Sequence, residues 1–155
     1  MDPPATMDNP NSSWVNHRGA WATNISVIIS LKIIFSSIPG MSSEASWTLT
    51  NLCYNTGTFI MFHWVSGTPF TLNQNENADL TLWEQMDGGL QFTPSKKFLF
   101  GLPIVLFLLS THYTHYDFAT FMINLASLIV VLVSKLPSMH MKRIFSEDIP
   151  IDKAD

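Results

Sequence analysis

Four apolar runs dominate the sequence and limit what the chain can fold into. They cover residues 20–38, 45–65, about 98–114 and 118–136. With a rise of about 1.5 Å per residue, a helix of about 20 residues crosses the roughly 30 Å hydrocarbon core of a bilayer. Charged residues make up only 13% of the chain, about half of their usual share in soluble proteins. We therefore expect an all-α membrane protein with four transmembrane helices.

Polar residues inside these runs are the next constraint. Asn24 and Lys32 lie in the first run, and Asn51 lies in the second. Such side chains are costly in lipid unless they face protein or reach the interface. In membrane helices, amide side chains more often join helices than contact ligands. We interpret these three residues as assembly residues, which pair within the bundle or face a second polypeptide.

Polar segments flank and interrupt the predicted membrane domain of residues 20–136. Residues 1–19 are expected to form a flexible cytoplasmic tail, and residues 137–155 are expected to form a second one. The loop between the second and third runs contains residues 78–86, whose pattern predicts a short amphipathic helix with Asn77 as its N-cap. Such a helix would lie at the membrane surface or against a partner.

The positions of the basic residues predict the orientation. The short turns at residues 39–44 and 112–117 contain neither Lys nor Arg. Basic residues concentrate on the cytoplasmic side of membrane proteins. Apart from Lys32, those of this chain precede the first run, lie in the middle loop, or end and follow the last run: Arg18, Lys96, Lys97, Lys135, Lys142, Arg143 and Lys153. Both termini and the middle loop are therefore expected to be cytoplasmic.

The net charge and the cysteine count argue against a nucleic-acid-binding, disulfide-bonded or cysteine-ligated metal protein. The net charge of −4 favours no nucleic-acid partner. Cys53 is the single cysteine, so neither a disulfide framework nor a cysteine-based metal site is expected.

Few residues suggest chemistry. His112 and His115 with Asp117 could bind a metal, which leaves a small membrane enzyme or lipid carrier as an alternative. One sparse histidine pair beside tyrosines is, however, more typical of a membrane interface. Glu84 and Asp87 could act as an acid–base pair, but a solvated helix face is the commoner arrangement. Without a nucleophile motif or a phosphate-binding loop, we expect no enzyme activity, no cofactor and no metal.

Short motifs running in order along the chain indicate a family. The most specific are Gly67-Thr68-Pro69-Phe70 and, at a fixed distance after it, Trp83-Glu84-Gln85-Met86-Asp87. On these motifs the chain resembles the ORM (orosomucoid-like, ORMDL) family of endoplasmic-reticulum proteins, although Ser66 stands where a Lys is common. The other motifs are Asn9-Pro10-Asn11, Arg18-Gly19-Ala20-Trp21, Trp47-Thr48-Leu49-Thr50-Asn51-Leu52, Lys97-Phe98-Leu99, Lys135-Leu136-Pro137 and Arg143-Ile144-Phe145.

The resemblance implies a function. Members of the family are non-catalytic subunits that inhibit serine palmitoyltransferase in response to ceramide and so control sphingolipid synthesis. It also implies that the N-terminal segment lies at the substrate entrance of that enzyme. The expected partners are therefore the catalytic subunits of serine palmitoyltransferase, ceramide and membrane lipids. A purely structural scaffold of a membrane complex remains an alternative.

The resemblance also implies three ceramide-contacting positions. Asn11 matches the family's N-terminal asparagine. Met61 stands where the family has a phenylalanine, and Leu82 stands where it has a histidine. An amide can both donate and accept hydrogen bonds to a ceramide amide or hydroxyl. Asn11 is therefore the leading candidate of the three.

Overall fold

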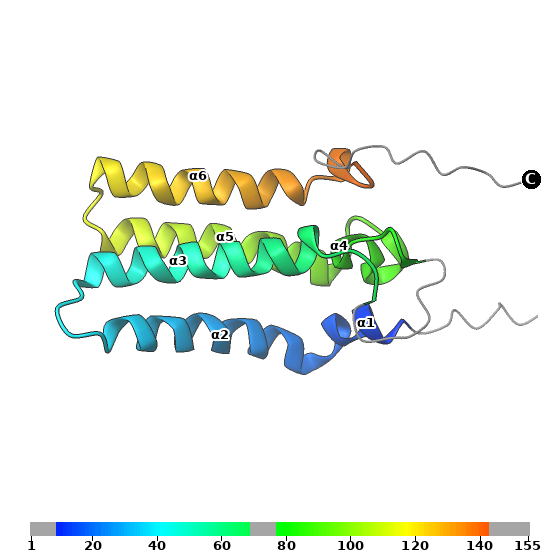
Figure 1. Ribbon diagram of the computed structural model, residues 1–155, viewed down its shortest axis with the longest axis horizontal. Coiled ribbons are helices and arrows are strands. Elements are labelled where there is room, and N and C mark those ends of the chain that lie inside the picture. Colours follow the sequence, from blue (N-terminus) through cyan, green and yellow to red (C-terminus); the bar gives the residue numbers. More distant parts are fainter. Residues whose placement is uncertain (1–8, 69–76, 143–155) are drawn as a thin grey trace, which may run out of the picture.

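The computed structural model of the chain describes residues 9–68 and 77–142. Four long helices make up most of this part: α2 (Arg18–Ser36), α3 (Ser43–Phe59), α5 (Pro94–Tyr113) and α6 (Phe118–Ser134) (Figure 1). A π-helix, η2 (Ile60–Trp64), continues α3 without a break. The described residues contain an isolated bridge between Ser66 and Thr81 but no β-strand. The all-α class predicted from the sequence is thus confirmed.

Side-chain caps set where three of the long helices begin. Ser42 accepts a hydrogen bond from the Ala45 amide at 3.1 Å before α3, and Thr93 accepts one from the Lys96 amide at 3.4 Å before α5. Asp117 accepts one from the Thr120 amide at 2.9 Å before α6. This bond to the backbone lowers the pKa of the Asp117 carboxyl below its ordinary value. Hydroxyl and carboxylate caps satisfy the free amides of a first helical turn and so fix where the helix begins. α6 begins at the expected residue, and the other long helices begin two to four residues before theirs.

α3 is the central helix of the bundle. It packs against α2, α5 and α6, and α5 packs against α6. Figure 1 shows the long helices side by side, with α2 and α6 at opposite edges of the bundle. α2 thereby buries few of its residues within the chain.

Buried amides join α3 to α6. Asn51 donates to Asn124 Oδ1 at 2.7 Å, and Asn55 donates to Ser127 Oγ at 2.8 Å. Asn51 Oδ1 also accepts from Asn55 at 3.2 Å, so the three amides form a chain. Asn51 and Asn124 are completely buried. Pairing of this kind is what allows amides to occur inside apolar helices.

Polar contacts also join α2 to α3. The Tyr54 hydroxyl donates to Asn24 Oδ1 at 3.0 Å. Lys32 Nζ donates to Ser46 Oγ at 2.7 Å and lies 4.9 Å from the ring centroid of Trp47. The assembly residues named from the sequence, Asn24, Lys32 and Asn51, thus all contact partners within the chain.

The two ends of the bundle differ. At one end lie α1 (Pro10–Ser13), α4 (Leu82–Gln85) and the segment that follows α6, on the right in Figure 1. At the other end lie the turns between α2 and α3 and between α5 and α6. His115 Nδ1 lies 3.2 Å from Glu44 Oε1 and links these two turns.

Two helices have the length and hydropathy of a membrane span. α2 has 19 residues and a mean hydropathy of 1.4, and α5 has 20 residues and a mean hydropathy of 1.2. α6 is apolar but has 17 residues, and α3 carries the buried amides. The count of four spans therefore stays a prediction.

The structure corrects two expectations about the polar segments. The middle-loop helix is α4, which begins at Leu82 after an N-cap at Thr81, rather than at residue 78 after Asn77. Its four residues are all buried, so it is not an amphipathic surface helix. In the expected N-terminal tail, residues 10–16 form α1 and the 3₁₀-helix η1 (Trp14–Asn16). Residues 1–8, 69–76 and 143–155, including Phe70 and the Arg143-Ile144-Phe145 motif, lie outside the described residues.

Asn51→Ala should lower the free energy of unfolding by about 1–2 kcal/mol, because the substitution removes the donor to the buried Asn124 Oδ1 and one of the two acceptors of Asn55 Nδ2. The measurement is a denaturation curve in mixed micelles. Cys53→Ala is the matched control, since Cys53 is exposed on the same helix. An equal loss for both variants would contradict the role given to the amide chain.

Candidate functional site

The N-terminal segment, residues 9–16, folds into two short helical turns. Asn9 caps α1, because its Oδ1 accepts a hydrogen bond from the Asn11 amide at 3.1 Å. Pro10 follows at the first helical position, where its missing N–H costs nothing. Trp14 Nε1 donates to the Asn11 carbonyl at 3.0 Å and closes the turn. The motif Asn9-Pro10-Asn11 therefore encodes a defined local structure.

Gln85 of α4 holds this segment in place. Its Nε2 donates to the carbonyls of Gly67 and Leu80, both at 2.9 Å. Its Oε1 accepts from Asn9 Nδ2 and from Asn11 Nδ2, both at 3.0 Å. Gln85 is only 5% exposed. One buried amide thus ties the middle loop to the N-terminal segment.

Two further polar contacts anchor the end of the N-terminal segment. Asn16 Nδ2 donates to Asp87 Oδ1 at 2.6 Å. Ser95 Oγ, at the start of α5, lies 2.7 Å from Asn16 Oδ1 and 3.3 Å from the Val15 carbonyl. Asp87 adopts a φ of 54°, a region in which Asp is commoner than most residues. The segment is therefore held at both of its ends.

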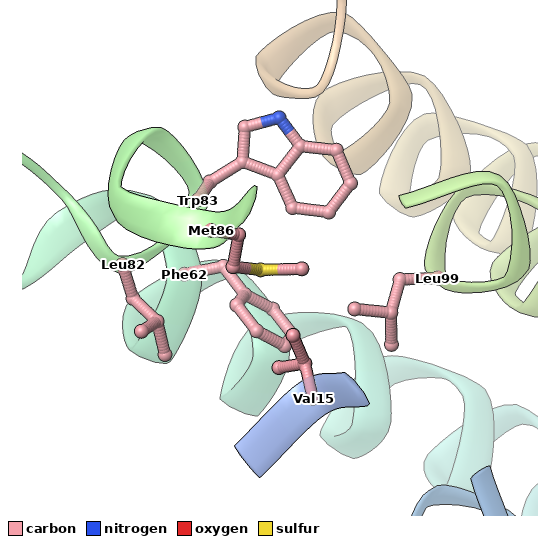
Figure 2. Packing of buried hydrophobic residues seen from close by; sticks show 6 residues of the cluster. All are labelled: Val15, Phe62, Leu82, Trp83, Met86 and Leu99. Atoms are coloured by element: carbon pink, nitrogen blue, oxygen red, sulfur yellow. The ribbon is translucent and has the colours of Figure 1, made fainter. Parts of the chain in front are cut away.

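An apolar cluster lies beneath these contacts. Figure 2 shows its side chains turned toward one another from η1, η2, α4, α5 and the 3₁₀-helix η4 (Met86–Gly89). Phe62 and Met86 are fully buried, and Trp14 and Phe98 pack against the cluster. Burial of this apolar surface stabilises the docked segment in addition to the hydrogen bonds. The members of the cluster are Val15, Phe62, Leu82, Trp83, Met86 and Leu99.

Two buried lysines lie against Trp83. Lys96 Nζ is 5.5 Å and Lys135 Nζ is 5.4 Å from the centroid of its ring. Lys135 also donates to the Leu99 carbonyl at 2.7 Å. Only 2% of Lys96 and 4% of Lys135 is exposed. Attraction between a cation and an aromatic face thus helps to hold α4 against the ends of α5 and α6.

Glu84 connects α4 to the segment after α6. Its carboxylate accepts from the Thr81 amide and from the Met141 amide, both at 2.8 Å. Glu84 is only 6% exposed. The expectation that it belongs to a solvated helix face is therefore wrong. Both of its oxygens are engaged in holding backbone amides, which is a structural role.

The three positions implied by the resemblance lie on connected elements. α4 contacts both α1, which carries Asn11, and η2, which carries Met61. Asn11 is half-buried and Met61 is 41% exposed, whereas Leu82 is 8% exposed and belongs to the apolar cluster. Asn11 and Met61 can therefore reach a ligand, while Leu82 supports the cluster beneath.

The three residues of the alternative metal site, His112, His115 and Asp117, each make a separate contact. His115 lies beside Glu44, and Asp117 caps α6. The His112 ring packs edge-on against Tyr113. Within residues 9–68 and 77–142, no three His, Cys, Asp or Glu side chains are grouped so as to hold a metal ion.

Sequence reasoning missed the residues that position Asn11. Gln85 and Asp87 belong to a family motif, but nothing in periodicity or composition predicts that they bind a segment more than 70 residues away. The positions of Lys96 and Lys135 in the sequence indicate topology but not their burial against Trp83. The one available signal was that Asn9-Pro10-Asn11 and Trp83-Glu84-Gln85-Met86-Asp87 both belong to the same set of motifs.

Comparisons with known proteins agree with these motifs. A model of the ORMDL family matches residues 9–143. An uncharacterized protein of Schizosaccharomyces pombe is 56% identical over 137 residues, which are 88% of this chain and 74% of that protein. Protein ORM1 of Saccharomyces pastorianus is 49% identical over 86% of this chain and 91% of its own length, and human ORM1-like protein 2 is 50% identical over 88% and 90%. With the family model covering the docked segment, the helices and the middle loop alike, the chain belongs to the ORMDL family.

Proposed function

We propose that this chain is a non-catalytic regulatory subunit that inhibits serine palmitoyltransferase in response to ceramide and thereby controls sphingolipid synthesis. The observation that carries the proposal is family membership over residues 9–143, which include the ordered N-terminal segment with Asn11. Inhibition needs no catalytic group of its own. It needs a surface that binds the enzyme and a ligand that favours the inhibited arrangement.

The docked N-terminal segment suits such a ligand. Asn11 presents a half-buried amide on a segment held by Gln85 and by the apolar cluster. A ceramide bound where this segment meets the enzyme would add contacts only in the inhibited complex. That difference in binding free energy is what any ligand-driven switch requires.

The lipid chains of the ligand would contact apolar residues near this segment. Met61 is exposed on η2, and a thioether adapts its shape to an acyl chain. Leu82 would act indirectly, because it is buried in the cluster that supports α4. Asn11 is thus the polar contact of the proposed site, and no cofactor or metal takes part.

We place the protein in the endoplasmic-reticulum membrane with four spans and both termini cytoplasmic. The contacts of Asn9 with Gln85 and of Met141 with Glu84 support this topology, because both described ends of the chain meet the middle loop. The basic residues other than Lys32 gather at this end or lie in the C-terminal tail. The turns at the other end contain neither Lys nor Arg.

Asn11→Ala should abolish most of the ceramide response while leaving assembly intact, because the substitution removes one polar contact but leaves the apolar cluster in place. We expect the ceramide concentration for half-inhibition to rise by about tenfold, the equivalent of about 1.4 kcal/mol. The measurement is serine palmitoyltransferase activity of the purified complex against ceramide. Ser13→Ala on the same short helix is the control.

The outcomes of this titration separate the candidate functions. Unchanged inhibition in Asn11→Ala would overturn the site. Co-purification of wild-type protein with the enzyme, without any effect of ceramide, would favour a structural scaffold. Failure to co-purify would overturn the partner, and metal content with activity lost in His112→Ala would favour a small membrane enzyme.

The topology predicts which introduced cysteines an impermeant maleimide can reach. In a Cys53→Ser background, Ser138→Cys should be labelled in sealed vesicles whose cytoplasmic face is outside. Ser37→Cys, in the turn after α2, should be labelled only after the membrane is permeabilised. Both parent residues are exposed, so folding does not limit labelling. Labelling of both before permeabilisation would rule out the proposed arrangement.

A further inference from the structure

The direction of each hydrogen bond around Gln85 is determined by backbone groups. Its Nε2 faces the carbonyls of Gly67 and Leu80, which can only accept. The amide of Gln85 must therefore turn its nitrogen toward the middle loop and its oxygen toward the N-terminal segment. Because O and N of an amide are assigned from the surrounding network, two carbonyls on the same atom make this assignment firm.

The orientation of the Gln85 amide determines how the amides of the two asparagines are oriented. Its Oε1 can only accept, so Asn9 and Asn11 must each present Nδ2 to it. Asn9 gives an independent check from the other direction. Its Oδ1 accepts from the Asn11 backbone amide, which is possible only if its nitrogen is the atom that faces Gln85. The bonds to Gln85 and the bond to the Asn11 backbone amide therefore give the same orientation for Asn9.

The orientation of Asn11 has a consequence for any ligand. Nδ2 is engaged by Gln85, and the backbone N–H and C=O are engaged by Asn9 and Trp14. Among the described residues, none donates to Asn11 Oδ1, and the residue is only half-buried. Asn11 therefore presents a hydrogen-bond acceptor on the accessible side of the segment.

We propose that Gln85 is the specificity-determining residue of this site, because it holds Asn11 with its oxygen outward and so selects lipids that donate a hydrogen bond. The inference rests on the proposed function, in which Asn11 contacts the lipid. A secondary amide or hydroxyl headgroup, as in ceramide, supplies such a donor. An ionised phosphate or an ester offers only acceptors and would face the Asn11 oxygen unfavourably. A site built around a hydrogen bond rejects analogues that lack the matching group.

The test compares ceramide with a chain-matched analogue that is methylated on its amide nitrogen and on both hydroxyl oxygens and so has no donor. Binding of each to the purified complex of the full-length protein with serine palmitoyltransferase, in mild detergent, is measured by competition with a photoactivatable ceramide. We expect the wild-type protein to prefer ceramide by about tenfold or more, which corresponds to one hydrogen bond. Equal binding of the two lipids by the wild-type protein would overturn the role of Gln85 while leaving ceramide binding in place.

Two substitutions of Gln85 make the test specific. Gln85→Met keeps the length but removes the acceptor, so the Asn11 amide can turn and the preference should fall to about twofold or less. Gln85→Lys supplies only donors, for both carbonyls and for Asn11 Oδ1, and should turn the Asn11 nitrogen outward and abolish the preference, because both lipids keep oxygens that accept a hydrogen bond. Gln91→Met is the matched control, because within the described part of the chain the Gln91 side chain bonds only the nearby Gly89 carbonyl.

The remaining outcomes are also decisive. A preference retained in both Gln85 variants would overturn the inference. If the complex with the wild-type protein binds neither lipid, the proposed function fails and the inference fails with it. If Gln85→Met does not fold, as judged by its elution and thermal unfolding, Gln85→Lys carries the comparison, since its ammonium can satisfy the same two carbonyls.

Discussion

The side-chain amide of Gln85 is the interaction on which the arrangement of one end of the bundle depends. It bonds two carbonyls of the middle loop and two asparagines of the N-terminal segment. The apolar cluster beneath it keeps water away, and hydrogen bonds are stronger where the local dielectric is low. Without Gln85, the Gly67 and Leu80 carbonyls and the Asn9 and Asn11 amides would all lose their hydrogen bonds to this side chain. The α4 motif is therefore better understood as a support for residues 9–16 than as a surface of its own.

The lengths and positions of the apolar runs were enough to predict the helical class and the approximate positions of the long helices. Their ends differ by a few residues because caps such as Ser42 and Thr93 act through single side chains. Tertiary contacts could not be predicted in the same way. Lys96, Lys135 and Glu84 look like solvent-facing residues by type, yet they are buried because Trp83 and backbone groups offer them partners.

For the candidate site as well, the sequence supplied the candidate residues and the structure supplied their contacts. Asn11 was identified from a resemblance, and the structure adds how its amide is oriented and by what. Met61 and Leu82 came from the same resemblance, but only Met61 is exposed. For Asn24, Lys32 and Asn51, the physical rule that a polar group in an apolar setting needs a partner leads to the expectation of contacts with protein. It does not say which partner each residue has, and the structure shows Tyr54, Ser46 and Asn124.

The burial of Lys96 and Lys135 has a consequence for membrane insertion. On the proposed topology, these two lysines count among the charges that orient the chain while it enters the bilayer. Once the bundle has formed, the same charges lie against Trp83 and the Leu99 carbonyl, out of reach of lipid headgroups. Lys96 and Lys135 would thus orient the chain during insertion and then lie buried in the folded bundle. On that proposed topology, the mature cytoplasmic face is less basic than its sequence suggests, and Arg18, Lys97 and Lys142 are the described cations left to meet anionic lipid.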